Sequence, residues 1–167
     1  LENTVGFKPN LQALLLRNLV LGADHIASNV LHFYHLALMD FIKGPQMNPW
    51  APGYGQDLRF SDADTQVFIN NYLTALTIRR KSHEMGAIFG GKLPHAASIV
   101  AGGVTSLPTA TDISNFKNYL TQVQSFITNQ YQADINKLAS TYSDYYNVGK
   151  GYGNFIAYGA FDTNTSG

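Results

Sequence analysis

Three histidines in one apolar stretch have a spacing that a metal or haem site could use. His25 and His32 are seven residues apart, and His35 follows three residues later. In a helix this spacing places His25 and His32 on one face and brings His32 close to His35. Helical di-iron bundles, however, bind their metals through Glu-x-x-His pairs, and the stretch from Pro9 to Phe41 contains no glutamate. We therefore expect His32 and His35 to have structural roles.

A second polar segment, RRKSHEMGAIFGGKLPH, runs from Arg79 to His95. Its two consecutive glycines permit a tight turn, and Pro94 restricts the backbone that follows. Lys92 and His95 are therefore expected on a rigid turn. A phosphate-binding loop is excluded, because that motif needs Ser or Thr after the lysine and Leu93 stands there. On physical grounds alone, the simplest interpretation is the end of a helix with incidental polar groups.

The other residue patterns do not indicate catalysis. No serine lies in a nucleophile elbow, and His83-Glu84 lacks the second histidine of a zinc protease. The chain has no cysteine, so it has no disulfide, no thiolate metal ligand and no cysteine nucleophile. We predict no catalytic residue, metal ligand or cofactor site of its own in this segment.

Composition narrows the classes of partner. Charged residues make up 13% of the chain, against about 25% in an ordinary soluble domain, so much of the surface is either neutral and polar or faces other protein. The net charge is zero and the basic residues are scattered, which argues against nucleic-acid binding. Arg17, Asp24 and His25 interrupt the most apolar stretch, so we expect no membrane span.

The elements that position these residues are expected to be long helices. Apolar periodicity, together with Pro and Gly, predicts helices over about 9–42, 62–89 and 113–146. Pro9 suits a first helical turn, Ser61 and Asp64 resemble a capping pair, and Asp112 can cap the third helix. The fold class is therefore mainly all-α, a long-helix bundle with Gly/Pro-rich loops. The segment 90–108 is expected to be irregular, and the tail from Gly149 to form short strands or coil.

Several segments together resemble the large subunit of nickel–iron hydrogenases. They are LHFYHLALMDF (Leu31 to Phe41), the Arg79 to His95 segment and SIVAGGVT (Ser98 to Thr105), and their order and separation also fit. The loop GPQMNPWAPGY (Gly44 to Tyr54) is more similar to the periplasmic, sulfate-reducer type, which includes selenium-containing relatives. The resemblance covers most of the chain, and Gly-Gly-Lys-x-Pro-His is a fairly specific part of it.

The resemblance implies reversible oxidation of dihydrogen to protons and electrons at a Ni-Fe(CN)2(CO) centre. Electrons would leave through iron–sulfur clusters in a small subunit. In that family nickel is held by two Cys-x-x-Cys pairs, one near each end of the large subunit. Because this chain has no cysteine, we expect residues 1–167 to be a central helical portion of a longer large subunit. We also expect the chain to be inactive by itself and its parent enzyme to be periplasmic.

The resemblance also suggests roles for individual residues. His95 matches a histidine at the contact between large and small subunits, near the cluster closest to nickel. Lys92, Arg79 and Arg80 lie in the same motif and are expected to contact the small subunit or the surroundings of the metal ligands. One departure stands out: many relatives have an acid where this chain has Ser28, followed by histidine where it has Asn29. An acidic role for that helical turn is therefore in doubt.

Two alternatives remain open at this point. A non-catalytic helical scaffold or electron-transfer protein, related to the quinone-reducing subunit of respiratory complex I, would share the fold. Such a relative is not expected to keep Gly-Gly-Lys-Leu-Pro-His intact. An unrelated helical bundle that binds metal or haem is the other alternative.

Overall fold

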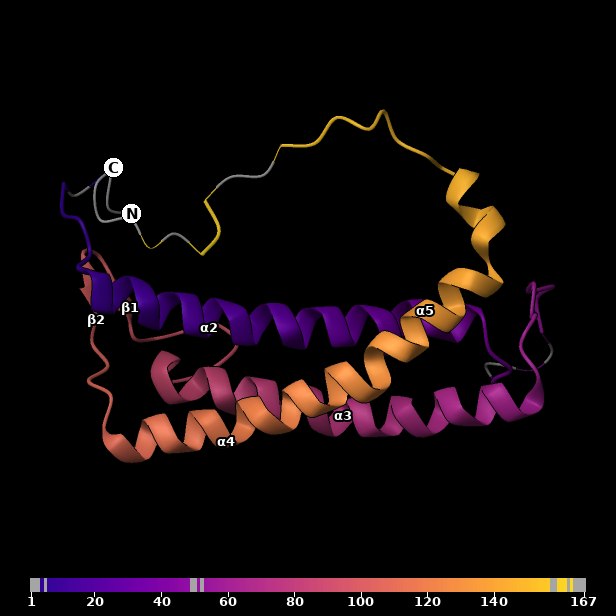
Figure 1. The fold of residues 1–167 in the computed structure, drawn as a ribbon, viewed down its shortest axis with the longest axis horizontal. Helices are drawn as coiled ribbons and strands as arrows, with labels where there is room; N and C mark the ends of the chain where they lie inside the picture. The colour runs from indigo at the N-terminus through magenta and orange to yellow at the C-terminus, as the bar shows by residue number, and fades with distance from the viewer. Residues whose placement is uncertain are drawn as a thin grey trace.

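The computed structural model describes residues 4, 6–48, 51, 53–156, 159–161 and 163. Three long helical segments run side by side in alternating directions, with a short hairpin at one end of the bundle (Figure 1). The segment that follows the third helix returns along the bundle toward the N-terminus (Figure 1). This arrangement confirms the predicted mainly helical fold class.

The first helical segment consists of α2 (Leu11–Val30), a π-helical turn η1 (Leu31–Ala37) and a 3-10 turn η2 (Leu38–Asp40). It begins two residues later than the expected start at Pro9, because the Asn10 side chain caps it and accepts a hydrogen bond from the Ala13 N–H at 2.8 Å. It also ends at Asp40, two residues earlier than expected.

The second helix, α3 (Asp62–Gly90), is close to the predicted range. Ser61 caps it by accepting a hydrogen bond from the Asp64 N–H at 3.1 Å. Gly91 ends it with a φ of +75°, a left-handed conformation that glycine adopts at low energy.

The third helical segment consists of α4 (Ala110–Phe126), the π turn η3 (Ile127–Tyr131), α5 (Gln132–Thr141) and the 3-10 turn η4 (Ser143–Asn147). It begins earlier than predicted, because Thr109 and not Asp112 is the cap. The Thr109 hydroxyl accepts from the Asp112 N–H at 3.1 Å, and the Asp112 carboxylate accepts from the Thr109 N–H at 2.9 Å. This reciprocal pair is a capping box.

The segment between α3 and α4 contains a small hairpin that the sequence did not predict. Its strands β1 (Ile99–Val100) and β2 (Gly103–Val104) pair antiparallel, with Ile99 opposite Val104. The tail after Gly149 was expected to form short strands or coil, and its described residues contain no strand.

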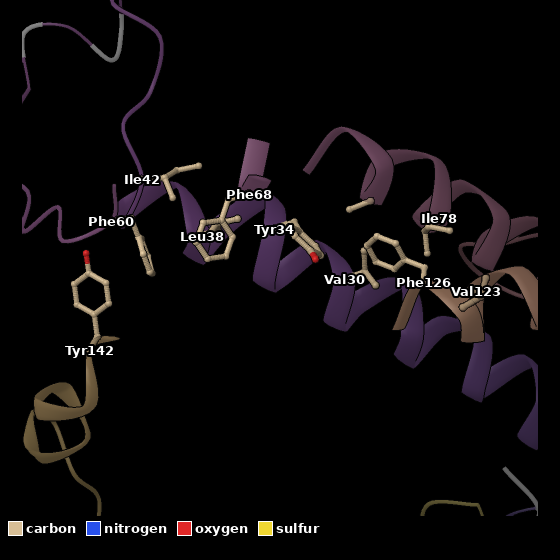
Figure 2. Close-up of a cluster of buried hydrophobic side chains, with 11 residues drawn as sticks. Val30, Tyr34, Leu38, Ile42, Phe60, Phe68, Ile78, Val123, Phe126 and Tyr142 are labelled. Atoms are coloured by element: carbon tan, nitrogen blue, oxygen red, sulfur yellow. The ribbon is translucent and has the colours of Figure 1, made fainter. Parts of the chain in front are cut away.

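Two apolar clusters hold the bundle together. The larger one surrounds Tyr34, where Leu38 and Val30 of the first segment face Phe68 of α3 and Phe126 of α4 (Figure 2). The smaller one lies nearer the hairpin and contains Leu16, Val20, Ala23, Met85, Phe89 and Phe116. In the described ranges, no helix has both the length and the hydropathy to cross a membrane.

Candidate functional site

The loop that follows α3, residues 91–97, carries two of the predicted site residues and is closed at its base by backbone hydrogen bonds. The carbonyl oxygen of Gly90 accepts from the Ala97 N–H at 2.9 Å and from the Ser98 N–H at 3.1 Å. The buried hydroxyl of Ser98 donates to the Phe89 carbonyl at 2.6 Å. The two ends of the loop are therefore tied to each other and to the last turn of α3.

Small residues on α3 let this loop pack tightly against the bundle. A Cβ on Gly86 would lie 2.2 Å from Cδ1 of Leu93, so the leucine fills the space that a larger residue would take. A Cβ on Gly90 would lie 3.3 Å from the Cβ of Ala96. Leu93 and Ala96 thus anchor the loop from inside.

Lys92 and His95 alternate with these anchors and point away from them, since both side chains are exposed. His95 has a φ of +64°, a left-handed conformation that is uncommon for residues with a side chain and costs about 1–2 kcal/mol. The surrounding hydrogen bonds hold that conformation. The result is a rigid loop that presents one ammonium group and one imidazole to its surroundings.

The hairpin is held to α2 by Arg17, a residue that sequence reasoning noted only as an interruption of the apolar stretch. Its Nη2 donates to the carbonyl of Val100 at 2.7 Å and to that of Gly103 at 2.9 Å. The Thr105 N–H in turn donates to the Ser98 carbonyl at 2.9 Å. A charged donor shared by two carbonyls is a strong tie, and it connects the loop and the hairpin to the first helix.

Arg79 and Arg80 do not join Lys92 and His95. They lie on α3 twelve and eleven residues before Gly91, which at 1.5 Å per residue is about 17–18 Å along the helix. Arg80 is exposed and forms an ion pair with Glu84 at 2.8 Å. Arg79 is half-buried, and its charge helps to lower the pKa of His35.

The histidines of the first segment face different neighbours. His25 packs edge-on against Phe161, with the ring centroids 5.5 Å apart. Nδ1 of His32 lies 2.7 Å from the Ser28 carbonyl on its own helix. His35 packs on Tyr72, with Nε2 3.3 Å from the Tyr72 carbonyl. Burial lowers the pKa of His35 below its usual 6.5, so its imidazole is neutral near pH 7.

Sequence reasoning did not identify a buried carboxylate at the centre of the larger cluster. Asp134 of α5 accepts from the Tyr34 hydroxyl at 2.7 Å and from the Asn71 amide at 2.8 Å. Burial, followed by this contact with the carboxylate, raises the pKa of Tyr34, so the hydroxyl stays protonated and remains a donor. An acid at an apolar position of the helical spacing, between Tyr131 and Leu138, was the available signal.

The residues of this chain do not fit a nickel site of the kind that the resemblance implies. Nickel held by thiolates needs cysteines, and the sequence has none. Within the described ranges, no three His, Asp or Glu side chains come together as a metal ligand set. The exposed loop with Lys92 and His95 is therefore the candidate site considered below.

Comparison with known proteins indicates one family. The sequence profile of the family described as "Nickel-dependent hydrogenase" matches residues 1–45 and 38–167. The chain is 38% identical over 169 residues to the periplasmic [NiFeSe] hydrogenase large subunit of Desulfomicrobium baculatum, covering 96% of this chain and 33% of that one. It is 28% identical over 189 residues to the quinone-reactive Ni/Fe-hydrogenase large chain of Wolinella succinogenes, covering 84% and 33%.

A solved structure is also similar. The as-isolated oxidised Ni-Fe-Se hydrogenase from D. vulgaris Hildenborough superimposes with a TM-score of 0.90 and 36% identity, over 97% of this chain and 34% of that one. The chain thus spans about a third of the length of the relatives it matches. The family profile covers the whole helical bundle and the loop with Lys92 and His95, and the chain belongs to the nickel-dependent hydrogenase family.

Proposed function

We propose that this chain is part of the catalytic large subunit of a nickel–iron hydrogenase, in which it supplies framework and contact surface. The complete enzyme would interconvert dihydrogen with protons and electrons. The nickel–iron centre that the family implies would be held by cysteines outside these residues, since the chain has none. Iron–sulfur clusters would lie in a small subunit that contacts the chain.

One observation carries this proposal: a loop fixed by backbone hydrogen bonds presents Lys92 and His95 outward, in a chain that belongs to the hydrogenase family. A left-handed backbone at His95 is tolerated at sites where the side chain has a function. We assign His95 to the contact with the small subunit, where its imidazole would donate a hydrogen bond near an iron–sulfur cluster. Lys92 would contribute to the same contact.

Arg79 and Arg80 belong to a different part of the surface, far along α3 from His95. We propose that the half-buried Arg79 contacts the remainder of the large subunit and so lies in the surroundings of the metal ligands. Arg80 already forms an ion pair with Glu84. We expect its role to be confined to this exposed face of α3.

Apolar grooves beside α2 support packing against the remainder of the large subunit. Two grooves of about 440 and 360 Å3 share Leu15, Leu19, Phe116 and Leu120 in their walls. Leu15, Leu19 and Leu120 are between 38% and 46% exposed. Apolar surface of this extent usually faces other protein.

We place the parent enzyme in the periplasm, as the name of the D. baculatum relative indicates for that protein. Family membership excludes the unrelated metal- or haem-binding bundle. The relatives named above are hydrogenases, so they favour the catalytic subunit over a scaffold related to complex I.

The purified 167-residue chain tests whether this segment is framework. We expect no hydrogen uptake with a redox dye and far less than one nickel per chain by elemental analysis, because no thiolates are present. The complete large subunit, prepared with its small subunit, is the positive control. Stoichiometric nickel, or dye reduction by the chain alone, would contradict the proposal.

A further inference from the structure

Arg79 lies half-buried on α3 without an acidic partner. Among the described residues it forms neither an ion pair nor a hydrogen bond. Four other cations of the chain are in ion pairs: Lys43, Arg59, Arg80 and Lys137. A guanidinium that is partly withdrawn from water loses hydration, and hydrogen bonds to an opposite charge normally offset that loss. Within the described part of the chain, the N–H donors of Arg79 therefore lack an acceptor.

The acids closest to Arg79 are not placed to pair with it. Glu84 of the same helix already binds Arg80 at 2.8 Å. Asp24 is exposed on α2, and the residue before it packs against Gly86. Asp24 therefore lies about 10 Å along α3 from Arg79. A carboxylate for Arg79 has to come from outside the described residues.

Arg79 belongs to a stripe of side chains on the side of α3 away from α4. Lys81 of the same helix bonds to Gln122 of α4, and residues two positions apart on a helix do not share a face. The members of the Arg79 stripe follow one another at spacings of three and four residues, and each is half-buried or exposed: Ile69, Tyr72, Leu76, Arg79 and His83. A stripe with this spacing and this burial is normally covered by other protein.

The Arg79 stripe continues the larger apolar cluster. Ile69 and Tyr72 pack against that cluster from α3, and Met39 does so from the first helical segment. The same three residues line a cleft of about 380 Å3, where Leu73 is 57% exposed. Protein that fills this cleft extends the core, as chain of the same subunit does. This chain spans about a third of the length of its relatives, so the subunit has further chain to supply.

We propose that Arg79 binds the carboxylate of an Asp or Glu in the remainder of the large subunit, on a segment that covers the Arg79 stripe and places an apolar side chain in the cleft. This assignment rests on the proposed function and adds the chemistry of the contact that Arg79 makes. A planar guanidinium fits a carboxylate through two parallel hydrogen bonds. With Tyr72 and Leu76 beside it, the covered pair is shielded from water and little screened by salt.

Carbodiimide cross-linking of the complete enzyme tests this contact, because the reagent joins a lysine amine to a carboxylate that touches it. The Arg79→Lys variant of the assembled large and small subunits should give a link from position 79 to an Asp or Glu of the large subunit outside residues 1–167. Mass spectrometry of the peptides identifies the link. Arg80→Lys is the matched control and should link to Glu84, the partner of Arg80 in the structure.

The rate of heat inactivation of the complete enzyme gives a second measurement, which holds even if Arg79→Lys does not assemble. Arg79→Gln should raise this rate by about fivefold or more at pH 7, because it leaves a covered carboxylate unpaired. Arg79→Lys, which keeps the charge, should lie between Arg79→Gln and the wild type. Arg80→Gln removes an exposed ion pair and should change the rate by less than about twofold.

The outcomes separate this contact from the function on which it rests. A control that links while position 79 does not, or links at position 79 only to acids within residues 1–167, would overturn the contact and leave the proposed function standing. The same holds for a link to the small subunit, or for equal effects of Arg79→Gln and Arg80→Gln, which would mean that Arg79 extends into water. A complete wild-type enzyme that takes up no hydrogen would overturn the proposed function, whatever position 79 contacts.

Discussion

The two ends of the bundle are stabilised by different kinds of interaction. Around Tyr34, large aromatic and aliphatic side chains fill the space between three helices, and a buried hydrogen bond to Asp134 fixes their register (Figure 2). At the other end, which contains the loop 91–97 and the hairpin, glycines of α3 allow the loop to pack closely against the helix. Hydrogen bonds to backbone carbonyls, such as that of Gly90, hold the loop in place. The first end derives its order from packing, and the second derives it from backbone geometry.

The charged groups follow the same division. At the end that contains the Tyr34 cluster, Arg59 forms ion pairs with Asp57 and Asp144. Its guanidinium carbon lies 4.6 Å from the centre of the Tyr142 ring. Its hydrogen bonds lower the pKa of both carboxyls. Lys92 and His95 instead extend outward from a rigid loop. We infer that one end stabilises the fold, whereas the other holds side chains in place for a partner.

Removing the central aromatic side chain should have the largest effect. Tyr34 is fully buried, so Tyr34→Ala should lower the free energy of unfolding by about 3–5 kcal/mol. Tyr34→Phe keeps the ring and removes one of two donors to Asp134, and should cost about 1–3 kcal/mol. Urea unfolding of the chain measures both. Equal losses would mean that the hydrogen bond, and not the packing, dominates this end.

A methyl group at the close approach of α3 and the loop should have the next largest effect. Gly86→Ala would place its Cβ 2.2 Å from Leu93, and the resulting displacement should cost about 1–3 kcal/mol. Gly22→Ala is the matched control, because its Cβ would lie an ordinary 3.6 Å from Phe161, and alanine should stabilise that helix by about 0.5–1 kcal/mol.

A second substitution and a local probe sharpen this comparison. Adding Leu93→Ala to Gly86→Ala should recover part of the loss, since it removes the clashing atoms. Hydrogen exchange should show faster opening at the amides of Ala97 and Ser98, which bond to Gly90. Unchanged exchange at those amides would mean that Gly86 does not seat the loop.

Acidification should have a smaller effect through His35. Burial lowers the pKa of His35 below 6.5, so the unfolded chain takes up this proton before the folded chain does. The stability contributed by the neutral imidazole is therefore present above pH 6.5 and is lost as the pH falls below it. The free energy of unfolding should fall less steeply between pH 7 and 5 in His35→Gln than in wild type. Identical slopes would contradict the assignment.

The second helix shows how much of the fold was predictable. Its Ser61 cap and its final glycine pair are local signals, and the structure has the helix within one residue of the predicted range. The predicted start of the third helix is three residues late, because Asp112 is not the cap but the second member of a capping box with Thr109, and that local spacing is present in the sequence. The π turns η1 and η3 have no clear local signature in the sequence.

The candidate site was predictable only in part. The glycines and proline of the loop are visible in the sequence and indicate a rigid turn at Lys92 and His95. The tie from Arg17 to the hairpin joins residues more than 80 positions apart, so no local pattern could predict it. Asp134 has a local signal, an acid at an apolar helical position, but its partners Tyr34 and Asn71 come from two other helices and could not be predicted from it.

Substitution of His95 in the complete enzyme tests the central claim most directly. His95→Gly relieves the left-handed backbone, so stability should stay the same or rise by up to about 1 kcal/mol. Electron transfer to a dye should nevertheless fall by about tenfold, equivalent to about 1.4 kcal/mol in activation free energy, while hydrogen–deuterium exchange at the metal is retained. Equal losses in the two assays, or a clear loss of stability, would contradict a loop that exists to present this side chain.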